Sequence, residues 1–249
     1  MIHVKVLGVT LLVGCIVAAT SASAAAEPKA AAPRTPRAVI HYDADGNVAR
    51  QEIDTKGAGR PNVWVYYERG VMVRQEEDTH GDGRPHVWSF FRDGRVERQE
   101  ADTKGTGRVD VWYTLDRAGR VVTKDMDTNG DGRADVWVRY DEGVRVEQRE
   151  DPTATGRPTI VYHFGGGRLV RSEESTTGDG RFDLVSYYEG DAMVRQEGRT
   201  ACGDRTDVWI RYRNGQKAVQ EEDTDCDGRA DVRFVYENGA VARKERVAN

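Results

Sequence analysis

The fold is decided by the stretch Asp127-Thr-Asn-Gly-Asp-Gly-Arg-Ala-Asp-Val-Trp137, because versions of it recur along nearly the whole chain. Its arginine returns at intervals of 24 residues six times and of 25 residues once. The eight arginines are Arg60, Arg84, Arg108, Arg133, Arg157, Arg181, Arg205 and Arg229. After each copy come an aromatic residue, a turn, a valine-containing run and, in most units, a glutamate. A unit copied at a fixed period predicts a repeat protein.

Each unit is predicted to fold as a β-hairpin. Runs rich in Val, Trp and Tyr favour a pleated strand, and Asp-Gly or Asn-Gly between two such runs is a strong hairpin signal. Such turns are Arg92-Asp-Gly94, Arg213-Asn-Gly215 and Glu237-Asn-Gly239. With a first hairpin from Val39 to Ile53 and a last from Val232 to Val247, the sequence predicts nine hairpins joined by eight loops.

The predicted fold class is therefore all-β, with tandem 24-residue hairpins forming an elongated, twisted antiparallel meander. Hairpin turns make consecutive strands neighbours, and a repeat array distributes its core along its length. Periodicity alone leaves two alternatives open, a propeller-like closed ring and a β-solenoid with one coil per unit.

The N-terminal residues stand outside the repeat. Residues 1–26 have one basic residue, Lys5, before an apolar stretch and a run of small residues, which predicts a signal peptide. The segment ending at Cys15 resembles a bacterial lipobox, so lipidation of that cysteine is the alternative. Residues 27–38 are rich in Pro and Ala and are expected to be a linker, followed by a single repeat array over 39–249. After residue 26 no apolar run approaches the ~20 residues of a spanning helix.

Charge excludes one class of partner. The formal net charge is −5, and removal of the signal with its single lysine makes it −6. Nucleic-acid-binding domains carry a clustered excess of Lys and Arg, so no nucleic-acid partner is expected. The expected location is periplasmic or extracellular, with a lipid anchor as the alternative form.

Two loops have the oxygen pattern of a calcium site. Oxygen-bearing side chains stand at loop positions 1, 3, 5 and 9, with glycine at position 6. The candidate ligands are Asp127, Asn129, Asp131 and Asp135 in one loop, and Asp223, Asp225, Asp227 and Asp231 in the other. This spacing resembles the DxDxDG loops of EF-hands and thrombospondin type 3 repeats, and the resemblance implies Ca²⁺ as the only cofactor.

Turn chemistry alone is the favoured interpretation of the same loops. Aspartates in Asx-type turns accept hydrogen bonds from nearby backbone N–H groups without any ion. The loop at residues 78–86, the second of the eight along the chain, is a variant with Asp78, His80, Asp82 and His86, whose two imidazoles would suit a softer metal. Solvated surface histidines are the favoured interpretation there.

Three further columns repeat with the unit. The eight arginines are expected to form ion pairs with loop aspartates or with a column of glutamates, in preference to an anion-binding ladder. Those glutamates are Glu52, Glu76, Glu100, Glu173, Glu197, Glu221 and Glu245. The tryptophans Trp64, Trp88, Trp112, Trp137 and Trp209 are expected to pack on one another rather than to stack on sugar rings.

Cys202 and Cys226 occupy the same loop position in consecutive units, and export would permit a disulfide between them. In a regular meander two strand spacings, roughly 9.6 Å, separate such positions, beyond the ~7 Å limit for a disulfide without local bending. A solenoid would bring them to about 4.8 Å. A disulfide is therefore expected to bear on the architecture.

The preferred function is a non-catalytic exported scaffold that presents a binding surface to a protein or glycan partner. The array is similar to MORN-type hairpin repeats in unit length and in its aromatic-turn-glycine rhythm, as in Tyr66-Tyr-Glu-Arg-Gly70. The alternative is a calcium-binding module. A carbohydrate-active enzyme is less favoured, because neither break in the pattern, at residues 163–167 and 200–204, unites a nucleophile with a base.

Overall fold

The computed structural model describes residues 37–247, in which all regular structure is β-strand. The strands are β1 (Arg37–Tyr42), β2 (Val48–Asp54), β3 (Val63–Glu68), β4 (Val71–Glu77), β5 (Val87–Arg92), β6 (Arg95–Ala101), β7 (Val111–Leu115), β8 (Val121–Met126), β9 (Val136–Asp141), β10 (Val144–Glu150), β11 (Ile160–Gly165), β12 (Arg168–Glu174), β13 (Leu184–Glu189), β14 (Ala192–Gly198), β15 (Val208–Arg213), β16 (Gln216–Glu222), β17 (Val232–Glu237) and β18 (Ala240–Arg246).

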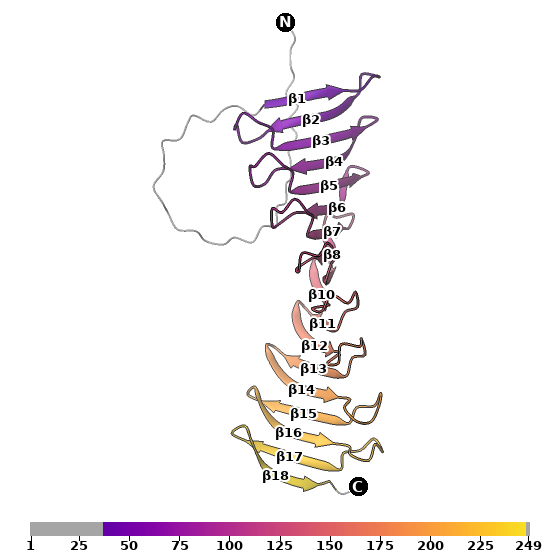
Figure 1. Ribbon diagram of the computed structural model, residues 1–249, viewed down its shortest axis with the longest axis vertical. Helices are drawn as coiled ribbons and strands as arrows, with labels where there is room; N and C mark the ends of the chain where they lie inside the picture. The colour runs from indigo at the N-terminus through magenta and orange to yellow at the C-terminus, as the bar shows by residue number, and fades with distance from the viewer. Residues whose placement is uncertain (1–36, 248–249) are drawn as a thin grey trace, which may run out of the picture. The chain divides into compact units, whose positions relative to one another are not determined.

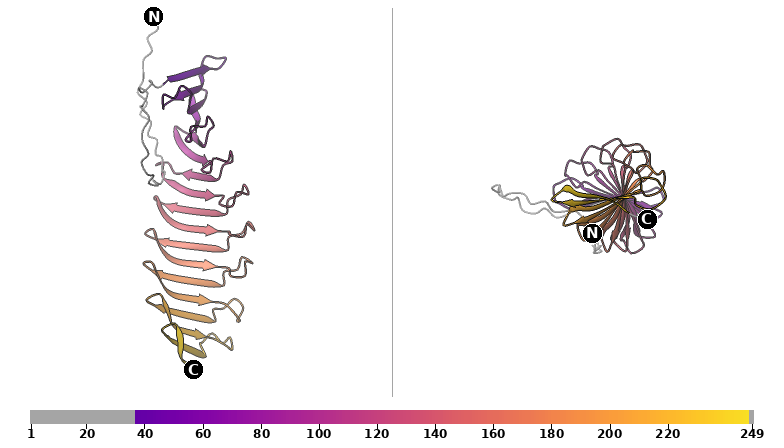
Figure 2. Two further views of the ribbon diagram at one scale, coloured as in Figure 1. Left: turned by 60° about the vertical axis from the view of Figure 1, so that its left-hand side comes forward. Right: turned by 90° about the horizontal axis from the view of Figure 1, so that it is seen from below.

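Each strand from β2 to β17 pairs antiparallel with the strand before it and the strand after it, so the predicted meander of nine hairpins is confirmed (Figure 1). The end strands β1 and β18 each have one partner, β2 and β17, which leaves the described sheet open rather than closed into a ring. Antiparallel pairing of neighbours also excludes a solenoid of parallel coils. Successive strands are rotated relative to one another, as Figure 2 shows.

The hairpin turns follow from their two central residues. Asn214 and Gly215 have φ of 52° and 74°, the left-handed conformation of both central residues in a type I′ turn, which Asn and Gly adopt at low cost. Next to this turn the register shifts between Arg211 and Tyr212, so that Ala218 has no partner in β15. A shift at the same place occurs in all nine hairpins, and such bulges increase the local twist.

The core is thin because all the strands belong to one sheet. Val63 and Val65 lie on one face and Trp64 on the other, and all three are buried beside neighbouring strands. Most other strand positions are only half-buried. The hydrophobic effect is therefore shared among many partly covered side chains, and each unit depends on its neighbours.

Strand β1 begins at Arg37, two residues before the predicted boundary at Val39. The predicted signal peptide at 1–26, the lipidation candidate Cys15 and most of the predicted linker at 27–38 lie outside the described residues. Across residues 37–247, no helix has the length and apolarity needed to cross a membrane.

Candidate functional site

The loops between hairpins are closed by buried acidic side chains. In the loop that follows β8, the two carboxylate oxygens of Asp127 accept hydrogen bonds from the backbone N–H groups of Gly130 at 2.6 Å and Gly132 at 2.7 Å. Aspartates equivalent to Asp127 are buried in the same way and accept from their own loops; they are Asp54, Asp78, Asp102, Asp151 and Asp223. These side chains perform the turn chemistry that was the favoured interpretation.

A second acidic column holds the start of each loop. Asp135 accepts from the backbone N–H of Thr128 at 3.1 Å and from its hydroxyl at 2.8 Å. The same bonds to the threonine that begins the loop are made by Asn62, Asp110, Asp183, Asp207 and Asp231. The N–H of Asp151 also donates to the carbonyl of Asp135 at 2.8 Å, which joins one loop to the next.

Backbone hydrogen bonds set the charge state of these acids. Burial raises the pKa of the Asp102 carboxyl, but hydrogen bonds from the backbone N–H groups of its loop, those of Thr106 and Gly107 above all, and the nearby His86 together outweigh it, so that its pKa lies below the ordinary value. The same balance lowers the pKa of Asp127 and Asp151. Hydrogen bonds to the charged form favour that form, so these carboxylates are held ionised at neutral pH.

In the first predicted calcium set the side-chain oxygens take part in hydrogen bonds within the loop. Asp135 is held by Thr128, and Asp127 is occupied by the loop glycines. The side-chain amide of Asn129 donates to Asp131 at 3.4 Å, while its oxygen accepts from the Asp131 N–H at 2.8 Å. The oxygens of this loop are therefore used within the loop.

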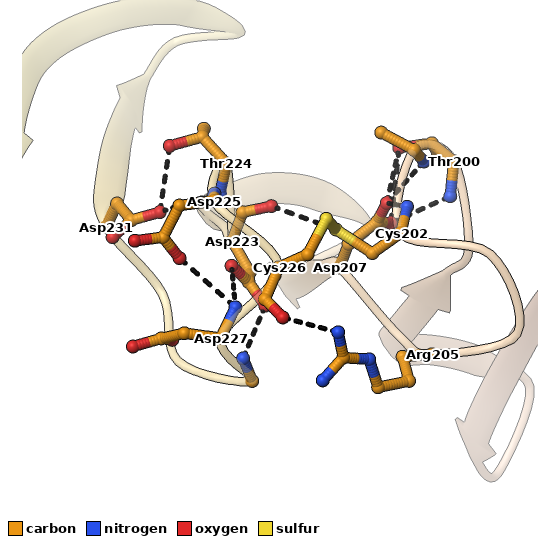
Figure 3. Close-up of a disulfide and its surroundings, with 12 residues drawn as sticks. Thr200, Cys202, Arg205, Asp207, Asp223, Thr224, Asp225, Cys226, Asp227 and Asp231 are labelled. Atoms are coloured by element: carbon orange, nitrogen blue, oxygen red, sulfur yellow. Dashed lines mark hydrogen bonds between the residues drawn. A yellow bond between two sulfur atoms is a disulfide. The ribbon is translucent and has the colours of Figure 1, made fainter.

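In the second predicted set three of the four acids come together. One carboxylate oxygen from each of Asp223, Asp225 and Asp227 lies within 4.8 Å of the others. Figure 3 shows these side chains in their loop. Asp231 instead accepts from Thr224. The hydrogen bond from the Asp227 N–H lowers the pKa of Asp225. Burial and the negative charges of Asp231, Asp227 and Asp223 raise it by more, so the pKa lies above its ordinary value.

A disulfide joins Cys202 to Cys226, as the sequence predicted, with a Cα–Cα distance of 5.4 Å (Figure 3). The disulfide is compatible with the meander, because the two loops approach each other more closely than two regular strand spacings would allow. The loop that contains Cys202 departs from the repeat: Asp204 replaces the usual glycine, and the Cys202 N–H donates to Asp207 at 2.8 Å. Cys226 keeps the left-handed conformation, φ 64°, which glycine has in most other loops.

The expected role of the repeated arginines is wrong. None of the eight forms an ion pair with a carboxylate in the described part of the chain. Two of them instead donate to a backbone carbonyl of the next loop, Arg60 to Gly81 and Arg205 to Cys226. Lys104 makes the equivalent link to the carbonyl of Asp127 at 2.9 Å. Carbonyl groups rather than side-chain acids connect these loops.

The glutamate column is paired with arginines of the strands. Arg74 lies 3.2 Å from Glu76 and its guanidinium stands 4.1 Å from the centre of the Tyr66 ring. Comparable Arg–Glu pairs form at Glu52, Glu100, Glu173, Glu197, Glu221 and Glu245. The sequence signal was present but overlooked: residues two apart on a strand share a face.

The tryptophans do not pack on one another. Trp64 lies opposite Glu52 on one side and Glu76 on the other, and Trp88 lies opposite Glu76 and Glu100. A carboxylate on the intervening strand therefore separates each tryptophan from the next. The face that carries the Trp column, called the Trp face from here on, alternates aromatic rings with Arg–Glu pairs.

Asp125 differs from the glutamates of the Trp face. It lies between Trp112 and Trp137, and Thr123 occupies the position from which an arginine pairs with the glutamate in most other units. Burial raises the pKa of the Asp125 carboxyl. This acid is desolvated by its neighbours without a guanidinium to offset the cost.

Comparisons with known proteins give no family. No family model matches the chain, and no curated protein matches it. Among solved structures, the crystal structure of TcdB2-TccC3-Cdc42 matches over 80% of this chain and 14% of that one, with 13% identity and a TM-score of 0.23. This chain thus spans about a seventh of that protein, and a likeness this weak carries no argument.

Proposed function

We propose that this protein is a non-catalytic, exported scaffold that presents a repeated surface to a protein or glycan partner in the cell envelope or outside the cell. The observation that carries the proposal is the single sheet. All described strands belong to it, so no second layer of strands or helices covers either face between residues 37 and 247. The loops, in contrast, use their acids internally.

The Trp face is the surface that we assign to recognition. Tryptophans on alternate strands repeat every two strand spacings, about 9.6 Å, from β3 to β9. Rings flanked by guanidinium and carboxylate groups suit a partner that offers both apolar and hydrogen-bonding groups. A regular row of such groups favours a partner with its own repeat, such as a glycan chain, or an extended protein segment.

Export is supported by the character of residues 1–26 and by the Cys202–Cys226 disulfide, since disulfides persist in oxidising compartments. Lipidation at Cys15 is the alternative form of the mature chain. The pattern breaks also fit a non-catalytic role. His163 is held 2.8 Å from Glu173, and the altered loop after β14 is occupied by the disulfide.

Photo-crosslinking in cells tests the proposal. A photoreactive residue at Arg98 reports on the Trp face, one at Gln99 reports on the opposite face, and one at Lys104 reports on a loop. The proposal predicts that the Arg98 position captures a defined protein or glycan and that Ala substitution of Trp88 and Trp112 reduces the capture. Capture from the Gln99 or Lys104 position alone, or from none of the three, would contradict it.

Calcium binding is the second candidate, and the convergence of Asp223, Asp225 and Asp227 is the observation that favours it. A cation would relieve the repulsion that raises the pKa of Asp225. Calorimetric titration with Ca²⁺ is expected to give a weak site, in the ~10⁻⁴–10⁻³ M range of extracellular modules. Asp227→Ala should abolish the binding heat and Asp131→Ala should not. Equal effects of the two substitutions, or no heat at all, would reject this site.

A further inference from the structure

The loop between β4 and β5 breaks the second acidic column. His86 stands where the other loops have an oxygen-bearing side chain. Six of these side chains accept from the threonine at the start of the loop, those of Asn62, Asp110, Asp135, Asp183, Asp207 and Asp231. Thr79 begins this loop, and its hydroxyl contacts the Nδ1 atom of His80 at 3.2 Å instead of His86. The imidazole of His86 therefore does not accept from the loop threonine as the equivalent oxygen side chains do.

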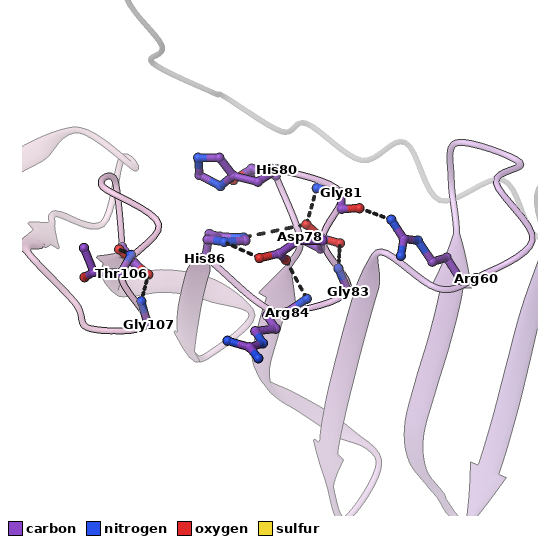
Figure 4. A network of polar contacts seen from close by, with 12 residues as sticks. Arg60, Asp78, His80, Gly81, Gly83, Arg84, His86, Thr106 and Gly107 are labelled. Carbon is purple, nitrogen blue, oxygen red and sulfur yellow. Dashed lines mark hydrogen bonds and ion pairs between the residues drawn. The ribbon is translucent and has the colours of Figure 1, made fainter.

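The His86 side chain lies between two carboxylates. Only 4% of it is exposed, with Nδ1 at 3.6 Å from an oxygen of Asp78 and Nε2 at 3.5 Å from an oxygen of Asp82. Figure 4 shows the ring beside Asp78, with His80 close by. Both distances exceed the ~2.7–3.2 Å of an N–H···O hydrogen bond. Among the described residues, Nδ1 is one of the few buried side-chain nitrogens without a hydrogen-bond partner.

The buried carboxylate retains capacity for a further partner. Asp78 accepts from the N–H groups of Gly81 and Gly83, one bond to each oxygen. An ionised carboxylate has about four acceptor positions. Asp78 can therefore close the loop, as its counterparts do, and still offer an oxygen towards His86. Asp82, with half of its side chain exposed, leaves the group accessible from solvent.

We propose that Asp78, Asp82 and His86 form a binding site for a divalent transition-metal ion of the Zn²⁺ or Co²⁺ class. One ligand atom from each residue lies within 4.8 Å of the others. One ion takes a single nitrogen of an imidazole, and two ligands at ~2.0–2.2 Å from a tetrahedral ion are about 3.4 Å apart, close to the 3.6 Å between Nδ1 of His86 and the Asp78 oxygen. An imidazole nitrogen joined to carboxylate oxygens suits Zn²⁺ or Co²⁺ better than Ca²⁺, which takes oxygen ligands.

His80 is the nearest additional ligand. Its ring centre lies 4.0 Å from that of His86 at an interplanar angle of 57°, and His80 is exposed to solvent. Rotation of this side chain would supply a second nitrogen, with water in any remaining position. The alternative explanation of the same distances is an imidazolium ion held between two carboxylates with no metal.

Metal titration of the full chain, stripped with chelator, separates the two explanations. Zn²⁺ binding is measured by calorimetry and Co²⁺ binding by its visible absorption. The site predicts one equivalent per chain at this loop. His86→Asp restores the oxygen of the repeat and His86→Asn copies Asn62, so the repeat itself supplies two variants designed to keep the fold. His163→Gln, which alters the histidine held by Glu173, is the matched control.

The proposal predicts that both substitutions at His86 weaken Co²⁺ and Zn²⁺ binding at least tenfold and remove the Co²⁺ absorption of a nitrogen-containing site. The control should bind like the unaltered chain. Binding that is equal in the His86 variants and the unaltered chain would overturn the site. Absence of saturable binding, with His86 observed by NMR as an imidazolium, would overturn it in favour of the ion-pair explanation.

Discussion

Replacing the buried acid of a loop should destabilise the array at that loop. Asp102 has 2% of its surface exposed and accepts from the N–H groups of Thr106 at 3.0 Å and Gly107 at 2.6 Å. Asp102→Ala removes both bonds and leaves two donors without partners. Hydrogen bonds to a charged group contribute about 1.5–3 kcal/mol each, so we expect a loss of about 3–6 kcal/mol.

The chain contains its own intermediate case. Ser175 occupies the position of Asp102 in another unit, and its hydroxyl accepts from the N–H of Gly180 at 3.1 Å. Asp102→Ser should therefore lose less than Asp102→Ala. Glu97→Ala is the control, because Glu97 is 45% exposed and pairs with an arginine that is 72% exposed. Such surface pairs contribute about 0–1 kcal/mol.

Amide hydrogen exchange with urea unfolding measures this effect locally. Units in a repeat array contact only their neighbours, so exchange should accelerate near Val87 and Val111 and change little near Val208. A loss below about 1 kcal/mol, with the amides of Thr106 and Gly107 still protected, would refute the assignment of the loop structure to the buried carboxylate.

Four further predictions follow from the same contacts. Reduction of the Cys202–Cys226 disulfide, or Cys226→Ser, should lower the free energy of unfolding by about 3.5 kcal/mol, because the bond closes a loop of 24 residues in the unfolded chain. Urea unfolding with and without reductant measures the change, and an unchanged midpoint would count against it. The folded-state pKa values of Asp102, Asp127 and Asp151 are lowered. The stability that these carboxylates contribute should therefore be fully present above the unfolded-state pKa of about 3.9 and should be lost as pH falls through their folded-state values. A melting temperature that stays level from pH 5 to pH 2 would argue against this pH dependence. Asp125 has a raised pKa, so Asp125→Asn should raise the melting temperature at pH 7 but not at pH 3, and a lower melting temperature at pH 7 would show that its charge is useful. Gly215 has φ of 74°, so Gly215→Ala should cost about 1 kcal/mol in thermal unfolding, whereas a stabilised variant would contradict the type I′ turn.

The hairpins could be predicted because their signals are local. Asn214-Gly215 selects its turn from the conformational preferences of two residues, and the Val and Trp runs select strands from their side-chain shape. The order of the strands followed because short turns make consecutive strands neighbours. The bulge beside each turn was not predicted, because the extra residue, such as Ala218, is of no residue type that marks a bulge in the sequence.

The candidate sites were predicted less well, because they depend on where side chains point between units. The column of Arg60 was assigned to ion pairs, but its loop lies beside the carbonyl groups of the next loop rather than beside the glutamates. The glutamates are taken by strand arginines such as Arg74, which the two-residue alternation could have indicated. The convergence of Asp225 with Asp223 and Asp227 depends on side-chain directions within the loop.

The most direct test of the account is amide hydrogen exchange of the full chain in the presence of chelator. If buried aspartates close the loops, the amides of Gly83, Gly107 and Gly132 should be protected without any metal, in a pattern that repeats with the unit. Loops that exchange rapidly in chelator and become protected only when Ca²⁺ is added would contradict the account, because bound ions rather than backbone hydrogen bonds to aspartate would then order the array.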